Sequence, residues 1–202
     1  MTICQANKSC IVYIVLLLYV LPCLAQNWDI DLLKKINPDN PNSGYWKVTS
    51  SSAYWLPASG IVATFLSGTI KHDKELQIKS YQALIAIGAD VVTSQIIKVS
   101  VNRTRPAYAY PDDINEATPK NNPGHSFPSG HTSLAFNYAT TVSLQFKKWY
   151  VVVPAYAWAG TVGYSRLYRG KHYPSDVFAG AVLGTASSWL SYKLSKKLFV
   201  QK

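Results

Sequence analysis

The sequence has little cysteine, and none of it lies beyond residue 23. The three cysteines, Cys4, Cys10 and Cys23, are confined to the N-terminal segment. The rest of the chain therefore offers no thiol for a disulfide, a catalytic thiolate or a cysteine-ligated zinc ion. Whatever chemistry that part performs must use other side chains.

Acidic residues are also scarce. Ten Asp and Glu stand against 20 Lys and Arg, a formal net charge of +10, and charged residues make up only 15% of the chain. A basic excess can serve nucleic acid, anionic lipid or a small anionic substrate. No run of five basic residues occurs, and the polar surface is thin for a soluble nucleic-acid binder. The composition favours a membrane or a deeply buried core and no nucleic-acid partner.

The N-terminus has two interpretations. One interpretation is a secretory signal peptide, which has a basic residue, an apolar run and small residues before the cleavage site. Here these are Lys8, the run from Ile11 to Leu21 and the residues up to Ala25. The uncharged stretch from Ser9 to Trp28 is alternatively long enough to stay as a spanning helix. We predict residues 1–25 to be a signal peptide or a first transmembrane helix, and 26–202 to form one domain. Either way residue 26 begins outside the cytoplasm.

The remaining chain has the pattern of a helical bundle. Residues 26–47 predict a short amphipathic helix and a loop, and apolar segments follow at Val48–Ile70, Ser80–Ile97, Thr132–Phe146, Trp149–Tyr164 and Val177–Tyr192. The third and fifth are shorter than the roughly 20 residues of a spanning helix, and the mean hydropathy of 0.00 is low for a polytopic protein. Gly, Ala, Ser and Thr among larger apolar residues suit packed membrane helices and a buried soluble bundle alike. We predict an all-α fold, with about six transmembrane helices counting the N-terminal one.

The connections between these segments differ in character. The short basic connections KHDKELQIK and KK, with the tail KLSKKLFVQK, are expected inside, and the long loops 98–131 and 165–176 outside. Once the cations used for chemistry are left out, the balance of Lys and Arg weakly favours this orientation. We expect the two long loops at the outer, periplasmic face of the inner membrane. A soluble periplasmic or secreted protein is the alternative.

The first long loop opens with KVSVNRTRP. If residues 98–105 continue the preceding helix, Lys98 and Arg105 are seven apart and share a face, whereas Arg103 points elsewhere. Pro106 then ends the helix. This spacing directs two cations to one place, although a solvated basic helix end has the same pattern.

The same loop ends in PSGH, directly before a predicted helix. Ser129 and Gly130 then lie at the helix N-terminus, where free backbone N–H groups attract an anion and glycine permits its close approach. Ser129 could equally be a simple N-cap.

The second loop reads SRLYRGKHYPSD. Pro174 can occupy the first turn of the last helix, and Asp176 follows His172 by four residues. At that spacing the carboxylate can accept the imidazole N–H, which leaves the other ring nitrogen as a nucleophile or base. Such a pair alone is weak evidence.

Charge decides between a metal ion and an anion. His125, His131, His172 and Asp176 could be assembled into a zinc site. Lys98, Arg105 and Arg166 would lie in the same pocket, and fixed cations repel a divalent ion. They attract a phosphate, which arginine can bind through two hydrogen bonds. We therefore expect no metal and no other cofactor.

Three parts of the sequence together match a known signature: KVSVNRTRP, PSGH and SRLYRGKHYPSD. With them the chain resembles the type 2 phosphatidic acid phosphatase superfamily, which also contains haloperoxidases. The signature reads Lys-(x)6-Arg-Pro, Pro-Ser-Gly-His and Ser-Arg-(x)5-His-(x)3-Asp, and every fixed position is matched. The strings SFPSGHT and HYPSDVFAG are similar to those of the family's membrane lipid phosphatases.

The resemblance implies a helical bundle and a metal-free site that forms a phosphohistidine. His172 would be the nucleophile, Asp176 would orient it, and His131 would serve as general acid and then as general base. The groups that would hold the phosphoryl oxygens are Lys98, Arg105, Ser129, Gly130 and Arg166. The expected substrate is a phosphomonoester or diphosphate of a lipid, such as phosphatidate, phosphatidylglycerophosphate, a prenyl diphosphate or a lipid A type.

Two other activities fit the same motifs. One is a soluble, secreted acid phosphatase of broad specificity, and the other, disfavoured by the short chain, is a vanadium-dependent haloperoxidase. His125 falls outside the signature and is expected to be a loop or rim residue. Asp90 lies inside an apolar segment, and we expect its side chain either to pair with a nearby group or to belong to a pathway through the bundle. The motifs specify neither the head group nor the oligomeric state.

Overall fold

The computed structural model describes residues 26–119 and 124–200, and within them it is helical without strands. The elements are α2 (Gln26–Ile36), α3 (Gly44–Ile70), α4 (Lys74–Val101), α5 (Pro106–Ala109), α6 (Gly130–Phe146), α7 (Trp149–Tyr168) and α8 (Pro174–Val200). The predicted all-α fold is confirmed. The prediction for residues 1–25 lies outside the described residues.

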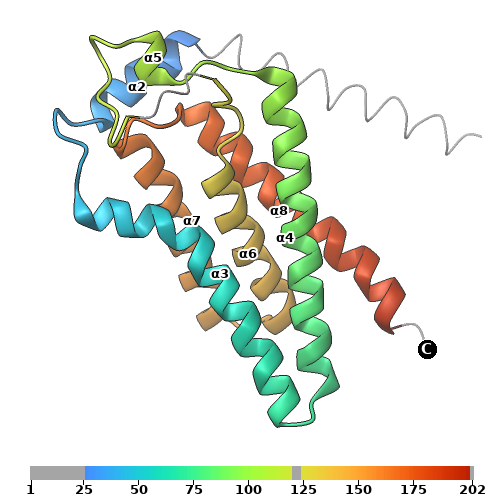
Figure 1. The fold of residues 1–202 in the computed structure, drawn as a ribbon. Coiled ribbons are helices and arrows are strands. Elements are labelled where there is room, and N and C mark those ends of the chain that lie inside the picture. The colour runs from blue at the N-terminus through green and yellow to red at the C-terminus, as the bar shows by residue number, and fades with distance from the viewer. Residues whose placement is uncertain (1–25, 120–123, 201–202) are drawn as a thin grey trace, which may run out of the picture.

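The long helices α3, α4, α6, α7 and α8 form one bundle, and α6 packs against the other four. Figure 1 shows α2, α5 and the long loops together at one end of the bundle, and the α3–α4 turn at the opposite end. The loops 98–131 and 165–176 therefore share one end, as the sequence predicted. Helix α3 contains Pro57 and changes direction along its length (Figure 1), because proline removes a backbone hydrogen bond inside a helix.

The end of α4 differs from the prediction. The helix stops at Val101, and Asn102 adopts the left-handed conformation with φ 43° while its N–H bonds the Lys98 carbonyl. Asparagine tolerates this conformation, and the proline that follows Arg105 favours an extended Arg105, with φ −69° and ψ 150°. The condition that residues 98–105 continue the helix therefore holds only as far as Val101, and Arg105 reaches the cavity from the loop.

The last helix is longer than its apolar segment. Helix α8 has 27 residues and begins at Pro174, the expected first-turn position. The helix continues beyond the apolar segment on both sides, where it carries Asp176, Lys193, Lys196 and Lys197. Helix α6, with 17 residues, is short as predicted.

Small residues allow α8 to lie directly against α6. A Cβ atom added at Gly180 would come within 2.6 Å of the Ser129 carbonyl, and one at Gly184 within 2.1 Å of the Ser133 carbonyl. The two backbones therefore touch, which only glycine permits. This contact places the first turn of α8 beside the N-terminus of α6.

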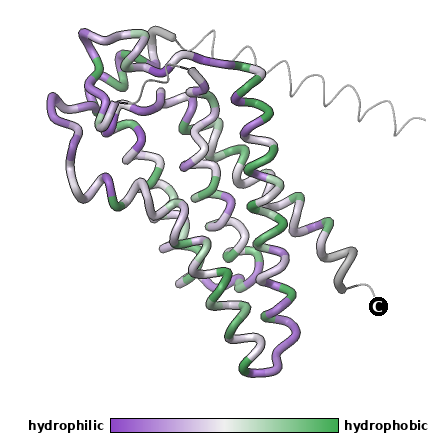
Figure 2. Tube along the Cα trace, in the orientation of Figure 1, coloured by the Kyte–Doolittle hydropathy of each residue, from purple (hydrophilic) through white to green (hydrophobic). Residues whose placement is uncertain are grey.

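The bundle is polar inside and apolar outside. Side chains such as Asp90, Ser133 and Asn137 are buried in the interior, whereas Leu66, Ile96 and many other large apolar residues are exposed on its surface. Figure 2 shows hydrophilic residues gathered at the loop end and the α3–α4 turn, with apolar stretches between. Water would not favour such a surface, but lipid does. Among the described residues one helical stretch, Lys74–Ala109, is long and apolar enough to cross a bilayer.

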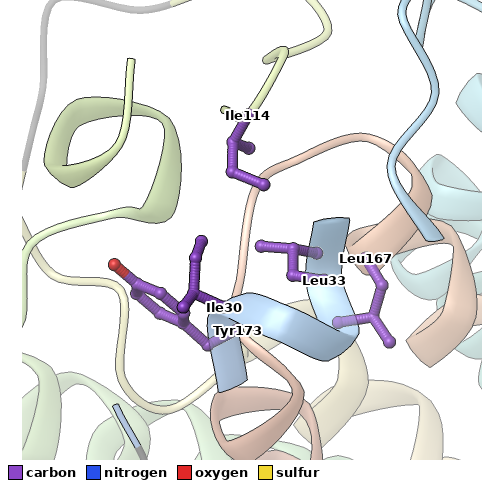
Figure 3. Close-up of a cluster of buried hydrophobic side chains, with 5 residues drawn as sticks. All are labelled: Ile30, Leu33, Ile114, Leu167 and Tyr173. Atoms are coloured by element: carbon purple, nitrogen blue, oxygen red, sulfur yellow. The ribbon is translucent and has the colours of Figure 1, made fainter. Parts of the chain in front are cut away.

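A small apolar core fixes α2 to the loop end. Ile30 and Leu33 of α2 pack with Ile114, Leu167 and Tyr173, all of them buried (Figure 3). The three partners come from both long loops and the end of α7. Burial of apolar surface stabilises a fold by roughly 25 cal/mol per Å². The packing of α2 therefore holds together the segments that build the site.

Candidate active site

A cavity of about 460 Å³ opens at the loop end of the bundle. Its wall combines α3, the end of α4, both long loops, the start of α6 and the end of α7. The lining residues are Lys47, Ser50, Ser51, Tyr54, Lys98, Arg105, Glu116, Thr118, Gly130, His131, Arg166, Arg169, Lys171 and His172.

Six of the eight predicted site residues line this cavity: Lys98, Arg105, Gly130, His131, Arg166 and His172. The other two, Ser129 and Asp176, are fully buried. Both contact the lining: Ser129 directly precedes Gly130, and Asp176 faces His172. Segments more than seventy residues apart are thus brought to one place, as the sequence predicted.

Lys98 is anchored by the loop that precedes α6. Its Nζ donates to the carbonyls of His125 and Pro128, at 3.1 and 2.7 Å. Two neutral acceptors fix the ammonium without cancelling its charge. The side chain therefore presents a positive charge beside Gly130 in the cavity wall.

Helix α6 begins as the sequence predicted, with Ser129 as N-cap and Gly130 as the first helical residue. The Ser129 side chain does not cap the helix, and its Oγ lies 2.9 Å from Thr132 Oγ1. Its N–H donates to the Asp176 carbonyl at 2.9 Å, so this N–H is not free for an anion. The exposed part of the helix N-terminus in the cavity is Gly130.

His172 lies in the short loop between α7 and α8 and is only 2% exposed. Its Nδ1 is 3.5 Å from Asp176 Oδ2, a long contact of the kind that tightens in a substrate complex. Burial, followed by the nearby positive charges of Arg166 and Lys98, lowers the pKa of His172 to about 3, although Asp176 opposes this shift. The imidazole is therefore neutral at physiological pH, as a nucleophile requires.

Asp176 is held by groups that the sequence analysis did not connect with it. Arg103 Nη1 donates to Oδ1 at 2.7 Å, while the Ser126 hydroxyl and the Tyr173 N–H donate to Oδ2 at 2.5 and 3.0 Å. Arg103 also donates through Nη2 to Asp29 of α2 at 2.9 Å. Arg103 thus points away from Lys98 and Arg105, as predicted, but toward the carboxylate that faces His172.

Asp29 is the second residue that sequence reasoning missed. It is fully buried, and it also accepts the Ser175 N–H at 2.9 Å and the Ser175 hydroxyl. The only signal in the sequence was an acidic residue on the apolar side of a short amphipathic helix. That signal gives no indication of a partner 74 residues away.

His131 faces Tyr54 of α3. The two rings meet edge to face with centroids 4.6 Å apart, and Tyr54 Oη is 3.4 Å from His131 Nδ1. This contact uses Nδ1, and His131 also lines the cavity. Tyr54 was not predicted, because no motif connects α3 with PSGH.

Part of the cavity wall lies outside the signature. Lys171 forms an ion pair with Glu116 at 2.6 Å, and Arg169 donates to Thr118 Oγ1 at 3.3 Å. Gly170 between them has φ 63°, and a Cβ there would meet the Asn115 carbonyl at 2.3 Å. Glycine is therefore needed for the loop 114–118 to pack on this turn.

Two further residues lie away from the cavity. His125 adopts φ 63° and places Nδ1 3.1 Å from the Lys98 carbonyl, outside the cavity lining, which agrees with its prediction as a loop residue. Asp90 accepts the Ser133 hydroxyl at 2.6 Å inside the bundle. Of the two predicted roles for Asp90, the structure supplies the local pair.

The model of the PAP2 superfamily matches residues 80–199, which is more than half of the chain. The chain belongs to the PAP2 superfamily. The family resemblance drawn from the three motifs is confirmed.

Curated relatives of this PAP2 chain include enzymes that act on lipids. A lipid A 4'-phosphatase of Bacteroides thetaiotaomicron is 28% identical over 177 residues, covering 84% of this chain and 79% of the relative. An undecaprenyl-diphosphatase of Sulfolobus acidocaldarius is 29% identical over 141 residues, covering 69% of this chain and 63% of the relative. Both named relatives are phosphatases.

Two solved structures share the fold. LpxE of Aquifex aeolicus has a TM-score of 0.64 and 27% identity, covering 82% of this chain and 95% of that one. A transmembrane PAP2 type phosphatidylglycerolphosphate phosphatase of Bacillus subtilis has a TM-score of 0.68 and 22% identity, covering 95% and 98%. The predicted helical bundle of the PAP2 kind is confirmed.

Proposed function

We propose that this PAP2 chain is a membrane-bound phosphatase that removes a phosphoryl group from a lipid phosphate or diphosphate without a metal ion. The observation that carries the proposal is one cavity in which two histidines face three cations of the signature. The lipid-directed relatives support the class of substrate. The apolar surface of the bundle supports a membrane location.

Lys98, Arg105 and Arg166 would hold the phosphoryl oxygens. Each lines the cavity, and none forms an ion pair with a carboxylate among the described residues. Charge-assisted hydrogen bonds from such groups stabilise the charge that develops on the phosphoryl oxygens in the transition state. The same positive charge disfavours a bound divalent ion.

His172 would attack phosphorus through Nε2, because its Nδ1 faces Asp176. A nitrogen–phosphorus bond forms while the bond from phosphorus to the leaving oxygen breaks, and Asp176 stabilises the positive imidazole ring. His131 gives its proton to the leaving oxygen. In the second step His131 takes a proton from water, the hydroxide attacks phosphorus, and phosphate leaves His172 free again.

The location proposed for the cavity is the outer, periplasmic face of the inner membrane. Either interpretation of residues 1–25 places residue 26 outside, and α2 lies at the cavity end of the bundle (Figure 1). The basic turns at Lys71–Lys74 and Lys147–Lys148 lie at the opposite end. Once the cations of the phosphoryl site are left out, the distribution of positive charge weakly favours the opposite end as the cytoplasmic one.

A panel assay tests this function. The full chain, purified in detergent, is given a diacylglycerol phosphate, a prenyl diphosphate and a glycolipid phosphate, with and without excess chelator, and phosphate release is measured. We expect release from at least one lipid at an undiminished rate in chelator. Loss of activity on chelation with recovery on adding zinc would contradict the metal-free mechanism, and release from none of the lipids would contradict the lipid-phosphatase function.

A further inference from the structure

The cavity holds more positive charge than a phosphomonoester needs. Six cations line it, with a single carboxylate: Lys47, Lys98, Arg105, Arg166, Arg169 and Lys171, against Glu116. A phosphomonoester carries at most about two negative charges. Half of these cations, Lys47, Arg169 and Lys171, do not occupy fixed positions of the signature, so the signature does not account for them.

Arg169 is the decisive member of this group. Its side chain lines the cavity although the residue is only 6% exposed, and its Nε is buried without a hydrogen-bond partner. Its Nη2 donates to the Thr118 hydroxyl at 3.3 Å, and no carboxylate in the described part of the chain pairs with it. A buried guanidinium without a counterion is costly. An anion in the cavity would remove that cost.

The nearby carboxylate is already engaged. Glu116 pairs with Lys171 at 2.6 Å, the two side chains being 5% and 7% exposed. Lys171 also donates to the Thr118 carbonyl at 2.8 Å. This pair is neutral as a whole, and it fixes the loop that carries Thr118 while leaving the charge of Arg169 unbalanced.

The position of Arg169 adjoins the phosphoryl site. It caps α7 three residues after Arg166, which is close to one helical turn, and Arg105 donates to the Lys171 carbonyl at 3.4 Å. The Ala117 N–H donates to the Arg169 carbonyl at 3.1 Å, so the turn is held from the opposite loop. Lys47, exposed on α3, adds a further cation to the lining.

We propose that Arg169, aided by Lys47, binds a second phosphoryl group bonded directly to the one that His172 attacks. The preferred substrate class is then a lipid diphosphate rather than a lipid phosphomonoester. This inference rests on the function proposed above. His172 Nε2 bonds to the terminal phosphorus, the bond to the bridging oxygen breaks, and the lipid monophosphate leaves from Arg169. Water then releases phosphate from His172.

The test compares matched substrates of one prenyl chain, its monophosphate and its diphosphate. We expect kcat/KM of the unchanged protein to favour the diphosphate by roughly tenfold or more, and Arg169→Gln to remove most of that preference, as loss of a charge-assisted hydrogen bond implies. Hydrolysis of the monophosphate should change little in that variant. Lys74→Gln, exposed at the opposite end of the bundle, is the matched control and should keep the preference.

A third substrate distinguishes a second phosphoryl group bonded directly to the first from a second phosphate elsewhere on the lipid. A glycolipid with phosphates on two distant sugar positions should respond to Arg169→Gln as the monophosphate does. Equal use of mono- and diphosphate by the unchanged protein overturns the inference, and so does an equal loss on both in Arg169→Gln. If Arg169→Gln does not fold, the inference is tested with Arg169→Lys and with the ratio of kcat/KM for the diphosphate and the monophosphate in the unchanged protein. Failure to hydrolyse any lipid phosphate is the different result that removes the proposed function.

Discussion

At the scale of the residue, the two histidines of the cavity have separate surroundings. His172 is buried against Asp176, and His131 faces Tyr54. His125, the third histidine of the loop region, uses its ring on the Lys98 carbonyl outside the cavity. We therefore expect substitutions of these three histidines to affect activity differently.

We expect His172→Gln to abolish turnover and the phosphoenzyme, by at least about a thousandfold, because no other group can take over as nucleophile. The measurement is phosphate release together with trapping of the acid-labile phosphohistidine. His125→Gln is the matched control and should retain activity within about twofold. Comparable losses in both variants would contradict the assignment.

The loss of activity in His131→Ala should depend on the leaving group of the substrate. With a lipid phosphate the leaving oxygen needs a proton, and the rate should fall by roughly 10²- to 10⁴-fold. With an aryl phosphate such as nitrophenyl phosphate the leaving oxygen is stable without one, so phosphoenzyme formation should fall much less. Rates of single-turnover phosphoenzyme formation check this, and an equal loss on both substrates would argue against proton donation by His131.

The pKa of His172 also affects stability. Burial is the main reason why the pKa of His172 is about 3 in the folded chain, compared with about 6.5 in the unfolded chain. Between these values the unfolded state binds more protons, so stability falls as pH decreases from about 6.5, by at most about 1.4 kcal/mol per pH unit. Thermal unfolding in detergent at pH 7.5 and pH 5 should show a smaller pH effect in His172→Gln. An identical pH effect in the two proteins would refute this.

At the scale of the element, α2 is a supporting part of the site rather than a linker. Its apolar face packs through Ile30 and Leu33, and its buried Asp29 binds Arg103 and Ser175. Arg103 in turn binds Asp176. A helix before the signature motifs thus helps to fix the carboxylate that faces His172.

Asp29→Asn should therefore lower kcat while KM changes little. The amide keeps the shape but removes the negative charge that holds Arg103, and a displaced Asp176 should slow phosphoenzyme formation roughly ten- to a hundredfold. Asp31→Asn, exposed on the same helix, is the matched control. A rise in KM alone, or equal effects of both variants, would exclude a positioning role for Asp29.

At the scale of the whole molecule, the bundle buries small and polar side chains and exposes large apolar ones. We expect the protein to stay with the membrane fraction in high salt and to be released by detergent, because its contact with lipid is apolar rather than electrostatic. Fractionation followed by immunoblotting measures this. Recovery of most of the protein in the salt wash would favour the soluble alternative.

The eight site residues could be predicted together because the three motifs in combination match one family signature. Each motif alone also fitted an ordinary feature, such as a solvated basic helix end or a simple N-cap. The path of the backbone between Lys98 and Arg105 was less predictable. Helical spacing suggested a shared face, but the left-handed Asn102 and the extended Arg105 replace it with a loop. The two side chains still reach the same cavity by different routes.

The sequence by itself determined the fold class and the family, and it predicted the residues proposed for the phosphoryl site, because hydrophobic segments and motif residues are local properties of the chain. The tertiary structure alone decided which groups support that site. Asp29 and Arg103 behind Asp176, Tyr54 beside His131, and Arg169 in the outer wall all depend on contacts between distant segments. Such contacts are set by how helices pack, and in this chain glycines such as Gly170 and Gly180, through their missing side chains, permit the close approach.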